Sequence, residues 1–412
     1  MQRLCLRLML AGVSLRGVAR TLAVLADVFG WTMPIPHWTT ARLWLLRLGH
    51  AMLTAPKEHA DDWAWLIDHS VQVGQGKCLV ILGLRLRDLP EPGQCLRHAD
   101  MKVLAIVPRP SWSGEQVDQD LEAATTMTGV PRVIVSDHGG ELNKGMALFQ
   151  QRHPQTVALY DAKHKAACLL KARLAHSPRW QEFQRRLEET RRAIQQTELA
   201  YLVPPGAKRK ARFMNLETDL RWAIRLLAIL RKSSPAVQAD SRPQRLAEKL
   251  GWLEGFAADV AEWSEWQQIV NVMVKFVNTQ GLKADAADTL RAAWPQTALH
   301  GSSAALAQEL VAFVAEQASR IGPQERFPGS TEILESCFGR FKQLEKQQAR
   351  GGFTSLLLGF GALVADTTTQ AISAAMAHSK TKKIFMWCRE HLGITWFSQR
   401  KMAFQTSATT TG

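Results

Sequence analysis

The chain has little tyrosine and cysteine and no long apolar segment. It contains two tyrosines and six cysteines, and the cysteines form no CxxC pair. This composition gives no zinc-site or disulfide pattern, so we expect reduced thiols that are mostly buried. The apolar run Leu356–Val364 is too short to span a bilayer, and the first ten residues lack the uninterrupted apolar core of a secretory signal. We therefore expect a cytoplasmic protein with no membrane partner.

The charge is positive overall and is distributed unevenly. The net charge is +14 for 412 residues. Residues 165–249 contain 19 Lys and Arg against 8 Asp and Glu, whereas residues 61–164 contain 10 against 13. A mildly acidic stretch between basic ones is typical of a protein that holds a polyanion around an acidic centre.

Residues 61–164 show the pattern of a mixed sheet with flanking helices. Apolar, β-branched runs bounded by turn residues predict five strands, and capped amphipathic stretches predict two helices. The first three strands follow each other through turns or loops, which favours antiparallel pairing, and the later ones are joined by helices, which favours parallel crossovers. The predicted strands are 63–71, 78–86, 101–107, 132–136 and 156–160, and the predicted helices are 114–128 and 140–151.

The remaining sequence is predicted to be helical. Residues 1–60 contain a helix capped by Ser14, a break at Pro34 and Pro36, and a second helix over 41–48 that ends at Gly49. This pattern is compatible with helix-turn-helix DNA binding, with Arg42 and Arg47 as contacts. Residues 165–330 have helical spacing throughout and form an all-helical insertion, and 351–412 form a helical tail. We interpret residues 206–212 as a basic loop, whose candidate DNA contacts are Lys208, Arg209, Lys210 and Arg212.

Three acids stand at positions where they could share metal ions. Asp68 and Asp137 each lie at the end of an apolar run, and Glu335 lies on a late helix, predicted over 331–348. Such a set can hold two Mg²⁺ ions, with Mn²⁺ as a substitute, and paired ions serve phosphodiester cleavage and strand transfer. Glu332 is three residues before Glu335 and shares its helix face, so it is the alternative third acid. Lys342 follows Glu335 by seven residues and could bind a phosphate.

The order of these elements and acids resembles the ribonuclease-H-like catalytic core of DDE transposases of bacterial insertion sequences. The resemblance is local to Ile67-Asp68-His69-Ser70, to the segment 133–139, and to the segment 335–342, where a glutamate is followed seven residues later by a lysine. A further point of similarity is Asp161 with His164, just after the fifth predicted strand. The resemblance as a whole covers about residues 61–170 and 330–350.

The resemblance implies a fold and an activity. The catalytic core would comprise 61–164 plus 331–350, with Asp68, Asp137 and Glu335 as metal ligands and catalytic residues, and Asp161 and His164 as supporting residues. The partners would be double-stranded DNA, as transposon ends and target, and further copies in a homodimer or larger assembly on the bacterial nucleoid. Two alternatives stay open, namely another ribonuclease-H-like metal nuclease and an inactive transposase-derived DNA-binding protein.

Overall fold

The chain forms two compact units. The computed structural model describes residues 1–73, 76–206, 213, 216–232, 241–294, 301–347, 353–393, 399–400 and 402–404. The first unit comprises Met1–Asp161 and Arg326–Gly412, and the second comprises Ala162–Glu325. No helix in these described ranges is long and apolar enough to cross a membrane. The predicted basic loop, with Lys208, Arg209, Lys210 and Arg212, lies outside the described residues.

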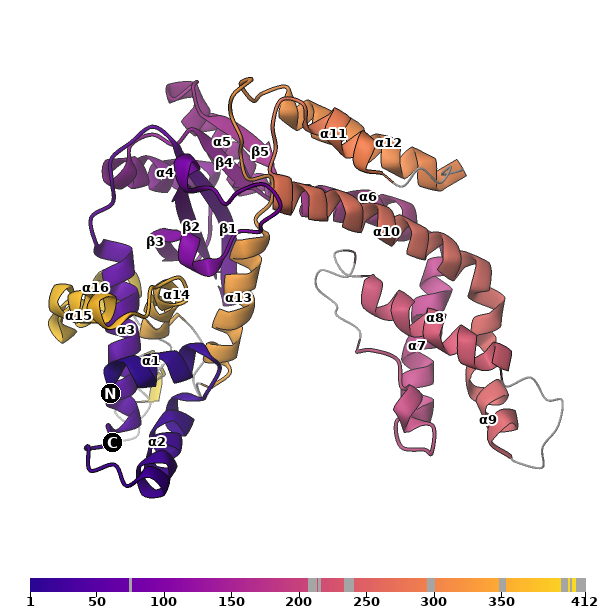
Figure 1. Cartoon of the computed structure of the whole chain (residues 1–412), viewed down its shortest axis with the longest axis horizontal. Helices are drawn as coiled ribbons and strands as arrows, with labels where there is room; N and C mark the ends of the chain where they lie inside the picture. Colours follow the sequence, from indigo (N-terminus) through magenta and orange to yellow (C-terminus); the bar gives the residue numbers. More distant parts are fainter. Residues whose placement is uncertain are drawn as a thin grey trace. The chain divides into compact units, whose positions relative to one another are not determined.

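A five-stranded mixed sheet is the centre of the first unit (Figure 1). Its order is β3-β2-β1-β4-β5; β2 pairs antiparallel with both β1 and β3, while β4 pairs parallel with β1 and β5. The α/β class and the mixed five-stranded sheet expected from the sequence are confirmed. The strands are β1 Trp63–Val73, β2 Gly76–Arg85, β3 Lys102–Arg109, β4 Val133–Ser136 and β5 Val157–Tyr160.

The two faces of the sheet have different neighbours. Trp63, Trp65 and Ile67 of β1 lie in a buried core with residues of α4 (Gly114–Thr128) and α5 (Gly140–Arg152). Side chains alternate along a strand, so Leu66 and Asp68 point to the opposite face. Helix α13 (Glu332–Glu345) also packs against β1. The predicted helix 114–128 has the same bounds as α4, which Ser113 and Gln116 begin with a capping box.

Both ends of the chain contribute to one helical module of the first unit. Helices α1, α2, α14, α15 and α16 all pack against α3 (Figure 1). We use the name helical module for these six helices. Their bounds are α1 Gln2–Leu10, α2 Leu15–Phe29, α3 Trp38–Thr54, α14 Gly359–Ala362, α15 Thr369–His378 and α16 Thr381–His391.

The predicted end of the second N-terminal helix at Gly49 is wrong, since α3 continues to Thr54. Gly49 is required by the approach of another backbone. A Cβ at this position would overlap the carbonyl oxygen of Leu358, and a Cβ at Gly361 would press on the carbonyl oxygen of Gly49. The glycine therefore allows α14 to lie directly on α3 and does not terminate the helix.

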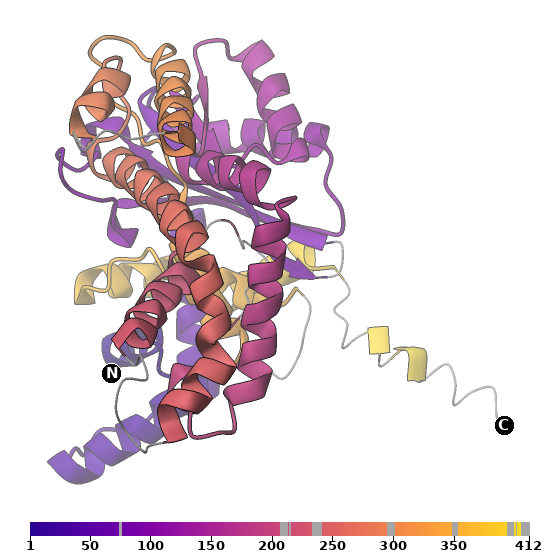
Figure 2. The same cartoon turned by 90° about the vertical axis from the view of Figure 1, so that its right-hand side faces the viewer.

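The second unit is helical in its described part, apart from an isolated bridge residue. Its longest helix is α10 (Figure 2). Trp180, Phe183 and Trp263 form its aromatic centre, with ring centroids of Trp180 and Trp263 4.8 Å apart. The predicted helical insertion, residues 165–330, falls on this unit. Its helices are α6 Ala162–Leu174, α7 Pro178–Ile194, α8 Glu217–Lys232, α9 Ser241–Leu250, α10 Ala257–Gln280, α11 Ala286–Ala293 and α12 Gly301–Ala318.

Candidate active site

The parallel pairing of β1 and β4 places two of the predicted acids side by side. Leu66 of β1 pairs with Val135 of β4. Asp68 and Asp137 each follow two residues later, so both stand at the same level of neighbouring strands, whose backbones lie about 4.8 Å apart in a sheet. Residues at the same level of adjacent parallel strands point to the same face, which for Asp68 is the face opposite to α4 and α5.

Asp161 stands at the same level next to Asp137, directly after β5. Ser136 pairs with Tyr160, and the backbone N–H of Asp161 donates to the carbonyl oxygen of Ser136 at 2.8 Å. The Asp161 side chain is 1% exposed, and its Oδ2 accepts a hydrogen bond from Thr331 Oγ1 at 2.6 Å. Thr331 is the N-cap residue of α13. Asp161 therefore holds the beginning of the helix that carries Glu335.

The carboxylates repel one another electrostatically. Burial raises the pKa of Asp68 well above its ordinary value of 3.8, and the charges of Asp137, Glu335 and Asp161 raise it further. The backbone N–H of His69 opposes this effect by donating to Asp68 Oδ1 at 2.6 Å. Among the two glutamates of α13, Glu335 and not Glu332 is one of the main causes of the raised pKa of Asp68. The structure thus brings Asp68, Asp137 and Glu335 into one electrostatic cluster.

The loop after β4 is shaped around Asp137. Asp137 Oδ1 accepts a hydrogen bond from the backbone N–H of Gly139 at 2.9 Å. A Cβ at residue 139 would lie 3.2 Å from that oxygen, so glycine gives the carboxylate room. His138 between them has a positive φ of 56°, and its ring stacks on Tyr160 with centroids 4.4 Å apart. The loop thus fixes Asp137 at the edge of the sheet.

His69 lies on the other face of the sheet. Its ring packs against Trp112 with centroids 4.8 Å apart. Burial, and after it the charge of the nearby Lys77, lower the pKa of the His69 imidazole to about 4. The ring is therefore neutral at pH 7. Nε2 of His69 is buried and has no hydrogen-bond partner among the described residues.

The donors at this edge are of the type that Mg²⁺ prefers. No group of three or more His, Cys, Asp or Glu side chains in the described ranges is arranged to hold a metal ion as it stands. The residues of the cluster fit a hard divalent cation by chemistry, because they offer carboxylate oxygens alone. A cation would also relieve the repulsion that raises the pKa of Asp68.

The other predicted site residues have mixed outcomes. Lys342 is exposed on α13, two turns beyond Glu335. His164 lies on α6 of the second unit, and its pairing with Asp161 stays a prediction. Arg42 donates to Ser355 Oγ at 2.8 Å, and Arg47 donates to the backbone oxygens of residues 376 and 379. Both guanidiniums are therefore bound by the C-terminal part of the first unit, residues 355–379, a role that the sequence did not indicate.

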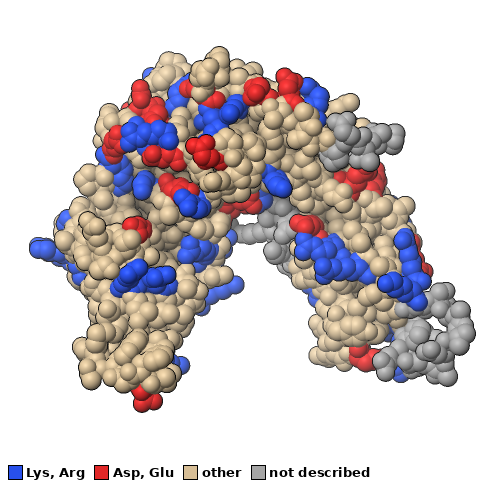
Figure 3. All heavy atoms as spheres, in the orientation of Figure 1, with Lys and Arg blue, Asp and Glu red and all other residues tan. Residues whose placement is uncertain are grey.

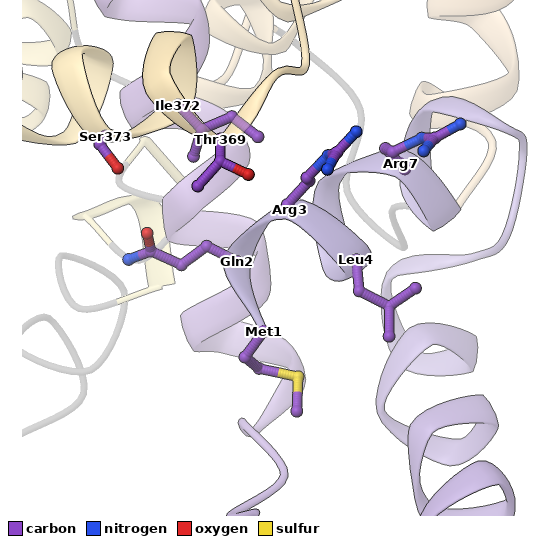
Figure 4. A pocket seen from close by; sticks show the side chains of 8 residues that line it. All are labelled: Met1, Gln2, Arg3, Leu4, Arg7, Thr369, Ile372 and Ser373. Carbon is purple, nitrogen blue, oxygen red and sulfur yellow. The ribbon is translucent and has the colours of Figure 1, made fainter.

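A basic groove in the helical module was missed by sequence reasoning. Residues 1–54 carry six arginines and a single acid, and in Figure 3 blue atoms outnumber red ones over α1, α3 and α16. Arg3 and Arg7, one turn apart on α1, line a groove of about 480 Å³ that Thr369 and Ser373 of α15 also line (Figure 4). Only the tertiary packing brings α15 to α1, so no local pattern could have revealed this groove.

Comparison with known proteins finds no family model that matches the chain and no curated sequence that is similar to it.

Proposed function

We propose that the protein is a DNA transposase of the DDE type with a ribonuclease-H-like core. The observation that carries the proposal is the electrostatic cluster of Asp68, Asp137 and Glu335 at one edge of the sheet. The sheet supports it as well, since β2 alone runs against the other four strands, and the acids lie within β1, directly after β4 and on the late helix α13. This is the order of elements on which the resemblance to DDE transposases depends.

Each acid has a distinct place in the proposed mechanism. Asp68 and Asp137 would bind Mg²⁺ from adjacent strands, and Glu335 would bind it from α13. Two bound Mg²⁺ ions would activate the attacking water or 3′-hydroxyl and stabilise the leaving oxygen. Asp161 would position Glu335 through its hydrogen bond to Thr331. Lys342, exposed on the same helix as Glu335, would bind a DNA phosphate near the cleaved bond.

The helical module is proposed to hold the DNA. Arg3 and Arg7 are exposed, and neither forms an ion pair within the described ranges. Arg3 Nε donates to the carbonyl oxygen of Thr367 at 3.1 Å, so Arg7 is the better placed of the two for phosphate, ahead also of Arg42 and Arg47, whose guanidiniums are already bound. The hydroxyl of Thr369, across the groove, would add a phosphate contact. A helix-turn-helix role for α2 and α3 stays a prediction.

A cleavage and strand-transfer assay tests the proposal. The substrate is DNA carrying the ends that flank the coding sequence, with Mg²⁺ or Mn²⁺. We expect joined products from the wild type and from Glu332→Gln, and a loss of at least about a hundredfold in Asp137→Asn and Glu335→Gln. The variant Glu332→Gln is a matched control because it removes a carboxylate one turn away on the same helix.

Each contrary result has a defined meaning. Cutting without joining would assign the protein to the metal nucleases. Loss of activity in Glu332→Gln with retention in Glu335→Gln would reassign the third acid. DNA binding without chemistry in any variant would indicate a protein that binds DNA and no longer cuts it.

A further inference from the structure

Arg340 lies on α13, five residues after Glu335, and binds the end of α1. Its Nη2 donates to the carbonyl oxygen of Leu10 at 2.8 Å, and its Nη1 lies 3.5 Å from the carbonyl oxygen of Leu363. Leu10 is the last residue of α1, and Leu363 is the C-cap residue of α14. The half-buried guanidinium therefore joins the helix that carries Glu335 to two helices of the helical module.

The contact completes the C-terminal end of α1. The last four carbonyl groups of a helix have no partner within it. In α1 the carbonyl oxygens of residues 7–9 accept hydrogen bonds from the backbone N–H groups of residues 11–13. The fourth carbonyl oxygen, that of Leu10, accepts from Arg340. Because the C-terminal end of a helix carries partial negative charge, a cationic donor is favoured at this place.

A second hydrogen bond joins the same parts of the chain. Gln347, two residues beyond the end of α13, accepts through its Oε1 from the backbone N–H of Leu15 at 2.8 Å. Leu15 is the first residue of α2, so the α13 segment binds on both sides of the connection between α1 and α2. In Figure 1, α13 extends from the sheet to the level of α1. One helix thus connects the candidate active site with the helical module.

His98 lies against the part of α13 between Glu335 and Arg340. It belongs to the connection between β2 and β3, and it contacts Ser336 and Arg340, which are four residues apart on one face of the helix. Arg340 Nη1 lies 3.3 Å from its Nδ1, and its Nε2 lies 3.2 Å from Ser336 Oγ. Because a guanidinium can only donate, Nδ1 is the acceptor, and Nε2 donates to Ser336. These contacts fix the rotation of α13 next to Glu335.

We propose that Arg340 is a positioning residue that holds Glu335 at the metal site by fixing α13 to the end of α1. The inference rests on the proposed function, in which Glu335 binds metal. The hydrogen bond from Thr331 to Asp161 fixes the beginning of α13. Arg340 fixes the helix nine residues later, about 14 Å along its axis, and Glu335 lies between these two points. A helix fixed at one end alone can tilt and rotate, whereas a metal ligand must stay within about 0.5 Å of its place.

Loss of the Arg340 contact should leave α13 packed on its neighbours. The rings of Phe338 and Phe341 pack against Phe360 of the short helix α14, with centroids 5.6 and 5.9 Å apart. Apolar contacts are not directional, so they hold the helix against the module without fixing its rotation. A variant at Arg340 should therefore keep the helix and change the position of Glu335.

Calorimetric titration of the full-length chain with Mn²⁺, without DNA, tests this inference. Arg340→Gln removes the charge and shortens the donor. It should weaken Mn²⁺ binding about tenfold, as the loss of a contact that orients a metal ligand does. Arg340→Lys keeps a cation for the carbonyl oxygen of Leu10, and its affinity should stay within about threefold of that of the wild type.

A double-mutant cycle separates positioning of Glu335 from a general loosening of the fold. Glu335→Gln alone should weaken Mn²⁺ binding at least about tenfold. Adding R340Q to this variant should change the affinity by less than about twofold, because Arg340 acts through Glu335. Arg47→Gln is the matched control: Arg47 also donates to two backbone oxygens, of residues 376 and 379, and neither lies on α13. Its Mn²⁺ affinity should equal that of the wild type.

The contrary results distinguish this inference from the proposed function. Wild-type affinity in Arg340→Gln, together with weaker binding in Glu335→Gln, would refute the positioning role and leave the proposed function intact. A further loss in the double variant, or an equal loss in Arg47→Gln, would show general loosening and would also refute it. Unchanged binding in Glu335→Gln would refute Glu335 as a ligand, and the proposed site and the inference would fall together.

Discussion

Replacement of Asp68 by asparagine should stabilise the protein in the absence of metal. The folded state raises the pKa of Asp68, because burial and the charges of Asp137, Glu335 and Asp161 disfavour its ionised form. The stability that protonated Asp68 contributes is fully present below about pH 3.8 and is lost as the pH rises through the pKa of the folded state. Asparagine carries no charge and keeps Oδ1 as the acceptor for the N–H of His69.

The expected gain in the free energy of unfolding of Asp68→Asn over the wild type grows with pH. It amounts to about 1.4 kcal/mol for each unit by which the folded-state pKa of Asp68 exceeds 3.8. Urea unfolding in EDTA between about pH 4 and pH 8 measures the free energy of unfolding of both proteins. The control Asp61→Asn removes an exposed aspartate of the same unit. Its free energy of unfolding should equal that of the wild type at every pH.

Added metal should make the wild type more stable than Asp68→Asn. A cation that binds only the folded state stabilises it by about 2.7 kcal/mol at a hundred times its dissociation constant. The wild type should gain this amount with Mn²⁺, and Asp68→Asn should gain less because it lacks one carboxylate. An Asp68→Asn variant that is less stable than the wild type in EDTA at pH 8 would refute the reasoning on repulsion.

Three further predictions concern single side chains. Thr331→Val should lower the free energy of unfolding by about 1.5–3 kcal/mol and reduce Mn²⁺ affinity, because the Thr331 hydroxyl donates to buried Asp161. Thr331→Ser keeps the hydroxyl and should retain the stability and the affinity of the wild type, as measured by urea titration and calorimetry. Gly49→Ala should lower unfolding free energy by about 3 kcal/mol through overlap with the Leu358 backbone, and an unchanged melting temperature would contradict this. His69→Phe should remove the loss of stability, roughly 3 kcal/mol, that the wild type shows as the pH falls from 6.5 to about 4, since protonation of the ring is disfavoured in the folded state.

Local features of the sequence were enough to predict most strands and helices of residues 61–164. The beginning of α4 follows from Ser113 and Gln116, which form a capping box within four residues. The start of β1 at Trp63 was predicted from its apolar run, although the strand extends two residues beyond the predicted end. Such signals are carried by neighbouring residues, so they are legible without knowledge of the fold.

The sequence by itself determined the kinds of element, the α/β class and the choice of Asp68, Asp137 and Glu335 as candidates. Tertiary structure alone decided which residues meet. The parallel register of β1 and β4 places Asp68 beside Asp137. The hydrogen bond from Thr331 connects Asp161 to α13, and α14 packs against Gly49. The physical reason is distance along the chain: Asp161 and Thr331 are 170 residues apart, and their contact depends on how the sheet and α13 pack.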